Sequence, residues 1–332
     1  MREIHKASGG PWGGIYVDRS YFEWLKAIFG ERAINEICSD VDESLDMQRE
    51  FEVKKRDLKS NSNTKIVFRI PSKLRELSLK YEEKPLKELI SAFQSKFGAK
   101  VDLVAGDKLR VDPSVLLGCM DVPLTSIIEH VAGLFKEPNM QSVNTLILVG
   151  GFGESNYVYE RMRTVFPDKQ VQVPKNAGLS VLKGAVVFGH SPDLVSSRVA
   201  RYTYGVALDQ RFHEGLSKQR TVLVGNENVT MGCFKKIVVA GEEIKFNAEV
   251  SHEFTANSSD YSHLEIFQST TQNPFYVDEP GCSKLGDLVV HHHGKGKGYS
   301  IVVTFLFGKT ELMVKYRVKE TGKEEFLKIN CL

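Results

Sequence analysis

Hydrophobic residues in the first two-thirds of the chain recur at two different spacings. Positions three or four residues apart predict helices, and alternation at every second position predicts strands. Helices are expected over residues 18–30, 43–59, 74–81, 86–97, 124–136, 157–166 and 179–188. Strands are expected over 64–70, 145–149 and 170–173, with a hairpin over 100–111. Asp18 is expected to cap the first helix, because Asp is favoured at helix N-termini. This part of the chain is therefore expected to be α/β.

From about Tyr202 the pattern changes to short alternating runs separated by Gly and Asn, with almost no helical periodicity. The runs cover residues 202–208, 234–239, 244–249, 264–269, 285–290, 300–306, 311–318 and 325–329. Such a pattern is typical of an antiparallel β-sandwich or barrel. We therefore expect an α/β domain over 1–190, with a helical and hairpin subdomain at about 40–115, a linker over 191–201 and an all-β domain over 202–332.

Residues 145–149 are expected to form a buried strand that runs directly into a glycine turn at Gly150, Gly151 and Gly153. Glycines at the carboxyl end of a strand let the backbone approach a ligand closely, so a nucleotide or phosphate site is one interpretation and simple packing is the other. A dinucleotide-binding fold fits poorly, because Asn156 stands where its fingerprint needs a third glycine.

Composition narrows the class of protein. With 332 residues, 42% of them hydrophobic and 26% charged, the chain is long enough for two globular domains. A net charge of +2 gives no reason to expect nucleic acid as a partner. Five cysteines without C-x-x-C spacing favour a reducing compartment, so the expected location is cytoplasmic. No membrane span is expected, because no apolar stretch reaches the roughly 20 residues required.

Several separated motifs resemble one known family. The segment 6–18, with Trp12-Gly13-Gly14, is similar to the glycine hairpin of the 70-kDa heat-shock chaperones, in the version of their divergent heat shock 70 kDa protein 12 branch. Residues 52–58 match the E-x-x-K-R-x-L helix of that family's adenine clamp, and 148–151 match its adenosine motif. The resemblance continues into the β-domain, through 204–206 and 311–323.

The resemblance implies the second lobe of an actin-like ATPase domain, followed by a β-sandwich substrate-binding-type domain. It also implies ATP or ADP as cofactor, with Mg²⁺ only in the complete domain, and protein or peptide clients for the β-domain. The nucleotide-binding positions that it assigns are Gly13, Gly14, Glu52, Lys55, Arg56, Lys59, Gly150, Gly151, Phe152 and Gly178. The chemistry is sensible, because a guanidinium can stack on a purine and carboxylates suit ribose hydroxyls. The alternative for Glu52, Lys55 and Arg56 is a solvated, salt-bridged helix face.

The chain also departs from the main chaperones. Phe152 replaces a small hydroxyl residue, Glu154 replaces an arginine beside the base, and the N-P-D-E turn becomes 176–179. The phosphate-loop motifs D-x-G-T-T and D-x-G-G-G-T are absent from the sequence, so no catalytic residue is assigned and ATP hydrolysis by this chain alone is not expected. We therefore expect a fragment of a longer protein, with a true short form as the alternative. The expected linker also lacks the short run of leucines that joins the two domains in the main chaperones.

The resulting hypothesis is an ATP- or ADP-binding protein with a chaperone-type or regulatory protein-binding role. The alternatives are a non-enzymatic scaffold with a degenerate nucleotide site and, as a third class, a sugar-kinase-like member of the actin fold. No metal site is assigned. His291, His292 and His293 lack a further ligand at suitable spacing, so they are expected to lie in a solvated loop.

Overall fold

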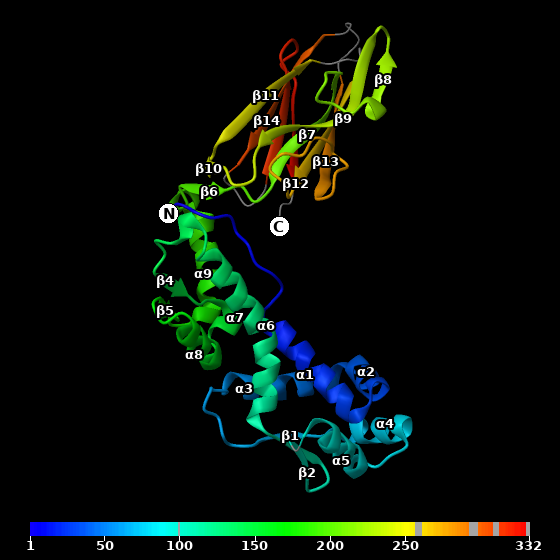
Figure 1. Cartoon of the computed structure of the whole chain (residues 1–332), viewed down its shortest axis with the longest axis vertical. Coiled ribbons are helices and arrows are strands. Elements are labelled where there is room, and N and C mark those ends of the chain that lie inside the picture. Colours follow the sequence, from blue (N-terminus) through cyan, green and yellow to red (C-terminus); the bar gives the residue numbers. More distant parts are fainter. Residues whose placement is uncertain (99, 256–260, 292–297, 308–311, 330–332) are drawn as a thin grey trace. The chain divides into compact units, whose positions relative to one another are not determined.

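Figure 1 shows the chain as a computed structural model that describes residues 1–332 except 99, 256–260, 292–297, 308–311 and 330–332. Two units have their own internal contacts. The helical unit is Gly9–Val186, and the β unit combines Met1–Ser8 with Val187–Leu332. The change from one unit to the other at residue 186 lies four residues before the expected boundary at 190. The first eight residues pair with the β unit, because Glu3 N donates to Ser197 O and Ser196 N donates to Met1 O.

The helical unit begins with three consecutive helices, α1 (Gly14–Phe29), α2 (Glu31–Ser39) and α3 (Val41–Arg56). The expectation that Asp18 caps α1 was wrong. The buried positions of α1 start at Val17, so the helix begins one turn earlier, with Gly13 at its N-cap. Asp40 caps α3 instead, and its carboxylate accepts from the backbone N–H groups of Asp42 and Glu43.

The next segment confirms the predicted helices and hairpin. It contains β1 (Ile66–Arg69), α4 (Ser72–Glu82), α5 (Leu86–Phe97), β2 (Val101–Val104) and β3 (Lys108–Val111). The three strands form an antiparallel sheet in the order β1-β3-β2. The hairpin turns at Ala105 and Gly106, both with positive φ, a backbone conformation that glycine adopts without strain.

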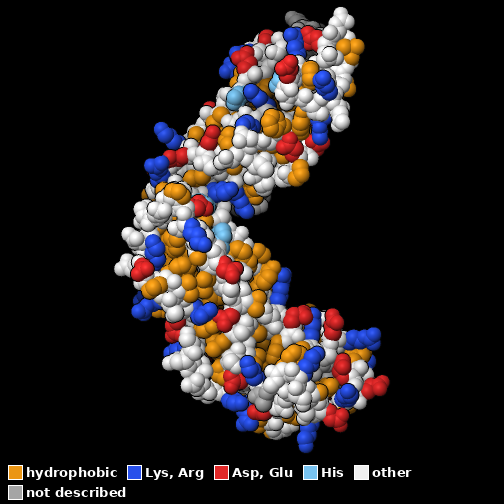
Figure 2. Space-filling view, viewed as in Figure 1, with side chains coloured by type: hydrophobic (Ala, Val, Ile, Leu, Met, Phe, Trp, Pro, Cys, Tyr) orange, Lys and Arg blue, Asp and Glu red, His pale blue; other side chains and the backbone are white. Residues whose placement is uncertain are grey.

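Helix α6 (Pro113–Leu134) begins eleven residues before the expected start at 124. Asp112 caps it and Pro113 occupies its first turn, while Pro123 lies inside the helix. Within the described residues, α6 alone is long and apolar enough to cross a membrane, contrary to expectation. In its most apolar stretch of 18 residues, 28% is buried. Core helices of folded domains share this composition, and Figure 2 shows hydrophobic side chains gathered along α6. Its residues Leu116, Cys119, Met120 and Leu124 belong to the core of the helical unit.

After the short 3-10 turn Pro138–Met140, strand β4 (Thr145–Ile147) pairs in parallel with β5 (Gln170–Gln172). Between them lie α7 (Gly150–Gly153), a single helical turn, and α8 (Asn156–Val165). The strand–glycine turn–helix–strand order was predicted, but the expected burial of β4 was wrong. Ile147 is 59% exposed, because the sheet has two strands and its faces are not fully covered. Helix α9 (Ala177–His190) follows and crosses the boundary between the units.

The β unit begins with the 3-10 turn Pro192–Leu194 and β6 (Ser197–Val199), which lie in the expected linker. Strand β6 pairs antiparallel with β10 (Glu243–Lys245). A five-stranded antiparallel sheet has the order β13-β12-β7-β9-β8. A four-stranded antiparallel sheet has the order β11-β14-β15-β16. Their strands are β7 (Thr203–Arg211), β8 (Thr221–Val224), β9 (Glu227–Val238), β11 (Glu249–Thr255), β12 (Tyr261–Ser269), β13 (Cys282–His291), β14 (Ser300–Leu306), β15 (Leu312–Val318) and β16 (Glu324–Ile329).

One buried cluster takes side chains from both of these sheets. Val206 and Ile266 come from the five-stranded sheet, while Val303, Phe305 and Tyr316 come from the four-stranded sheet, and all five are fully buried. The alternating burial along β15 matches the period-two pattern of its sequence. The predicted change from mixed α/β to all-β along the chain is therefore confirmed. Strands β6 and β8 were not predicted, and β11 was predicted only at its first residue. His291 ends β13 instead of lying in a loop, and His292 and His293 lie outside the described residues.

Candidate functional site

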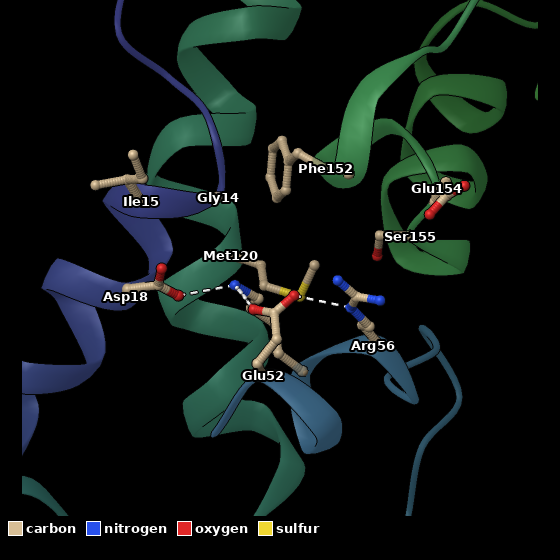
Figure 3. A pocket seen from close by; sticks show the side chains of 11 residues that line it. Gly14, Ile15, Asp18, Glu52, Arg56, Met120, Phe152, Glu154 and Ser155 are labelled. Carbon is tan, nitrogen blue, oxygen red and sulfur yellow. Dashed lines mark hydrogen bonds and ion pairs between the residues drawn. The ribbon is translucent and has the colours of Figure 1, made fainter. Parts of the chain in front are cut away.

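A cavity of about 470 Å³ lies inside the helical unit, where segments distant in sequence meet. The start of α1, the end of α3, the middle of α6 and the turn from α7 to α8 supply its walls (Figure 3). The lining residues are Gly14, Ile15, Asp18, Glu52, Lys55, Arg56, Met120, Gly151, Phe152, Glu154 and Ser155. Its volume falls in the range of small-molecule sites, roughly 300–1,000 Å³.

Six of the ten residues assigned from the sequence line this cavity. They are Gly14, Glu52, Lys55, Arg56, Gly151 and Phe152. The other four, Gly13, Lys59, Gly150 and Gly178, do not line it. Gly13 and Gly150 precede lining glycines in the chain, Lys59 is exposed in the loop after α3, and Gly178 contacts a lining residue through its backbone. The roles of all ten remain predictions.

Lys55 is the buried charge of the site, with a side chain that is 9% exposed. Its Nζ lies 2.7 Å from Asp18 Oδ1 on α1 and 2.5 Å from Glu52 Oε2 on its own helix. The ammonium also lies 5.5 Å from the centre of the Phe51 ring, a favourable position for a cation. Two carboxylates therefore compensate this one cation, and the three groups form a polar floor of the cavity.

Glu52 connects Lys55 to Arg56. Its other oxygen, Oε1, accepts a hydrogen bond of 2.8 Å from Arg56 Nε, four residues along the helix. Partial burial would raise the pKa of Glu52, but the hydrogen bonds from Lys55 and Arg56 outweigh it and hold that pKa below its usual value. The hydrogen bond to Glu52 raises the pKa of Arg56, whose side chain remains 67% exposed. Arg56 therefore offers a guanidinium face to the cavity while one edge is fixed.

The opposite wall is the glycine turn that follows β4. Gly150 has a φ of +79°, which lets the chain leave the strand and begin α7. Apart from its own helical turn and chain neighbours, no atom of the described residues lies within 4 Å of where a Cβ on Gly151 would stand, so the backbone there faces open space. In Figure 3 the Phe152 ring projects into the cavity. Glu154 Oε1 accepts from Gly178 N at 2.6 Å and so joins the turn to the start of α9.

Two contacts hold this wall against the rest of the unit. Tyr157 Oη on α8 donates to Asp121 Oδ1 on α6 at 2.7 Å, and burial together with this bond raises the pKa of Tyr157 to about 12. Ser60 N, in the loop after α3, donates to Glu160 Oε2 on α8 at 2.9 Å. Both contacts hold α8, which directly follows the lining residues Glu154 and Ser155, so they help to fix the shape of the cavity.

Sequence reasoning missed Asp18, Ile15, Met120 and Ser155 as lining residues. Asp18 was assigned to a cap, although its position one turn after Gly14 was a usable signal. Ser155 had no assigned role in the sequence. Its hydroxyl is buried and has no hydrogen-bond partner in the part of the chain that the structure describes, and the residue lines the cavity. Nothing in the sequence pointed to Met120, because only the packing of α6 against the other helices brings it to the site.

A second cavity, of about 460 Å³, is lined mainly by the carboxylates of Asp40, Asp42, Glu43, Asp46 and Glu50. Structural roles account for its main groups. Asp40 caps α3 and pairs with Lys73, while Glu50 pairs with Lys54 and accepts from Arg69 N. Among the described residues, no group of three or more potential metal ligands comes together. The first cavity is therefore the better candidate site.

Comparisons with known proteins agree with the motifs of the sequence. No family model matches the chain. The chain is 28% identical over 324 residues to heat shock 70 kDa protein 12A of Mus musculus, covering 94% of this chain and 47% of that protein. The human 12A protein is 28% identical over 87% of the chain, and human heat shock 70 kDa protein 12B is 26% identical over 87%. The chain spans about half the length of these curated relatives, 42–47%. The expected resemblance is confirmed: over nearly its whole length, the chain is similar to the divergent heat shock 70 kDa protein 12 branch of the 70-kDa heat-shock proteins.

Proposed function

We propose that the helical unit binds the adenosine end of ADP or ATP in the cavity between α1, α3, α6 and α7. One observation carries the proposal. Three motifs that are far apart in sequence, at Gly14, at Glu52 to Arg56 and at Gly151 to Phe152, meet around a single cavity. Such convergence is not expected if the charged end of α3 is only a solvated helix face.

The chemistry of the walls suits a nucleoside. The guanidinium of Arg56 can stack on a purine face, and the aromatic ring of Phe152 provides a second surface for stacking. Asp18 and Glu52 each have a carboxylate at the cavity, and carboxylates accept hydrogen bonds from ribose hydroxyls. The buried cation is already compensated by two carboxylates, so these residues fit the sugar and base better than a free phosphate cluster.

The wider role follows from the likeness to the heat-shock relatives. We propose an actin-like lobe followed by a β-sandwich that binds protein or peptide clients, in a cytoplasmic protein of chaperone-type or regulatory function. ATP hydrolysis is not assigned to this chain, because its sequence has neither phosphate-loop motif to position donors and metal around a γ-phosphate. Bound nucleotide would act as a ligand of the fold rather than as a substrate of this chain.

A non-enzymatic scaffold with a degenerate site is the second candidate. In the main chaperones that this chain resembles, the position of Glu154 carries an arginine. Glu154 instead gives the cavity a third carboxylate, which disfavours the binding of anions. In this case the β unit would carry the function and the cavity would bind no nucleotide.

Calorimetric titration of ADP with Mg²⁺ into the folded chain separates the two candidates. Binding is expected, and Arg56→Ala should weaken it by about 3- to 30-fold through loss of cation–π stacking. Arg49→Ala is the matched control, because Arg49 is also on α3, is 70% exposed and lies outside the cavity. Absence of binding at millimolar ADP would reject the nucleotide proposal and leave the scaffold.

A further inference from the structure

Ser155 occupies the N-cap of α8, where a serine side chain commonly accepts a hydrogen bond from the first turn of the helix. Here the hydroxyl makes no such bond. Its backbone is satisfied, because Ser155 N donates to Phe152 O and Ser155 O accepts from Tyr159 N. The Ser155 side chain therefore does not cap α8, although it occupies the capping position.

The same hydroxyl is buried and has no hydrogen-bond partner among the described residues. Ser155 is 9% exposed, and its Oγ is one of the few buried polar side-chain atoms left without a partner. Buried hydroxyls are nearly always paired, so one that is not indicates a missing partner. Because Ser155 lines the cavity, that partner can come from a ligand held there.

Figure 3 shows where this partner would lie. The Ser155 hydroxyl points from the α7–α8 turn towards the space above the Arg56 guanidinium, with Glu154 beside it and Phe152 on the other side of the cavity. If Arg56 stacks against the face of a flat ring, the Ser155 hydroxyl would lie beside the edge of that ring. A hydroxyl both donates and accepts, so it can bond either a ring nitrogen or an exocyclic amine.

We propose that Ser155 is a base-recognising residue of this cavity, whose hydroxyl hydrogen-bonds the polar edge of the six-membered ring of a purine that lies against Arg56. This inference rests on the proposed function and adds a residue that recognises the base rather than the sugar. It also explains why the N-cap of α8 is a serine whose side chain does not cap the helix.

The test combines ligand binding with the stability of the free chain. Ser155→Ala should weaken ADP binding by about 3- to 10-fold, the usual effect of losing one neutral hydrogen bond. The same change should raise the Tm of the free chain, because it removes a buried hydroxyl that has no partner. A serine that holds the fold through an internal hydrogen bond would do the opposite, so a lower Tm for Ser155→Ala overturns the proposal.

A base analogue identifies the bonded group. The diphosphate of benzimidazole riboside can stack but has no hydrogen-bonding atoms on its six-membered ring. Wild type and Ser155→Ala should bind it equally. An equal loss for this analogue and for ADP would overturn the assignment to the base edge. Ser180→Ala is the control, because the Ser180 hydroxyl bonds Asn176 O and lies outside the cavity.

The remaining outcomes separate the two proposals. Unchanged ADP affinity in Ser155→Ala, together with weaker binding in Arg56→Ala, would overturn the role of Ser155 and leave nucleotide binding intact. Failure of wild type, Arg56→Ala and Ser155→Ala alike to bind ADP, with all three folded, would overturn both proposals.

Discussion

Lys55 Nζ lies 2.7 Å from Asp18 Oδ1, so an ion pair joins the end of α3 to the second turn of α1 across 37 residues of sequence. The lysine is buried, whereas the Asp18 side chain is 37% exposed. The pair therefore has its cation inside and one carboxylate towards the cavity. The same two residues therefore join the two helices and form part of the wall of the candidate site.

Replacing Lys55 should expose this dual role. In Lys55→Met the carboxylates of Asp18 and Glu52 lose their shared cation, and we expect the free energy of unfolding to fall by about 1–3 kcal/mol. The cost stays below that of a fully buried pair because both carboxylates are partly exposed. Urea unfolding at pH 7 measures it. Lys59→Met, in the exposed loop after α3, should change stability by less than about 0.5 kcal/mol. Equal effects of the two changes would contradict the pairing.

Glu52 makes the stability of the helical unit depend on acid pH. Its pKa in the folded state lies below its usual value. A lowered carboxyl pKa contributes stability that is fully present above the unfolded value and is lost as pH falls through the folded value. We therefore expect the Tm of wild type to drop more steeply than that of Glu52→Gln between pH 5 and pH 3, in a series of melts. Parallel curves would show that Glu52 does not carry this dependence.

Neighbouring glycines of the α7 turn should respond in opposite ways. Gly150 has a φ of +79°, so Gly150→Ala is expected to destabilise the fold by about 1–2 kcal/mol. Gly151 is in open space at the cavity, so Gly151→Val should fold well but weaken ADP binding by about 10-fold, or about 1.4 kcal/mol. Thermal melts and calorimetry on both variants test this contrast. Loss of stability in Gly151→Val without loss of binding would contradict it.

Phe51 holds α3 in place from the core side. It is 1% exposed, and its ring stacks on Tyr21 of α1 with centroids 4.0 Å apart. Phe51→Ala should cost about 3–5 kcal/mol, as expected when a large buried aromatic side chain is removed. Val53→Ala is the control on the same helix, because Val53 is 64% exposed and should change stability by less than about 0.5 kcal/mol. Chemical unfolding of both variants gives the comparison.

Much of the fold was readable from periodicity and turn residues. The hairpin turning at Ala105 and Gly106 and the strand–glycine–helix–strand order around Gly150 are local patterns, and both were predicted. The start of α6 was not, because the helix was expected to begin only at residue 124, directly after Pro123, which lies inside α6. The exposure of β4 was also missed, because burial depends on what covers a sheet and not on the strand itself.

The site was predicted as far as motifs allowed. The matches at Gly14, Glu52 and Gly151 pointed to residues that the fold brings together. Met120 and Ser155 belong to no motif, and tertiary packing alone places them at the cavity. Residues that line a site through packing have no fixed spacing in the sequence, so pattern reasoning could not find them.

The pairing of the first residues with β6 has a consequence for the order of folding. Val199 N donates to Glu3 Oε2 at 2.7 Å, and Arg2 forms an ion pair with Glu243. These partners lie 196 and 241 residues apart in the chain. At a synthesis rate of about 5–20 residues per second, the first residues would wait roughly 10–40 s for β6 to leave the ribosome. During that interval the helical unit can fold, although residues 1–8, which precede it in the chain, still lack the strand β6 with which they pair.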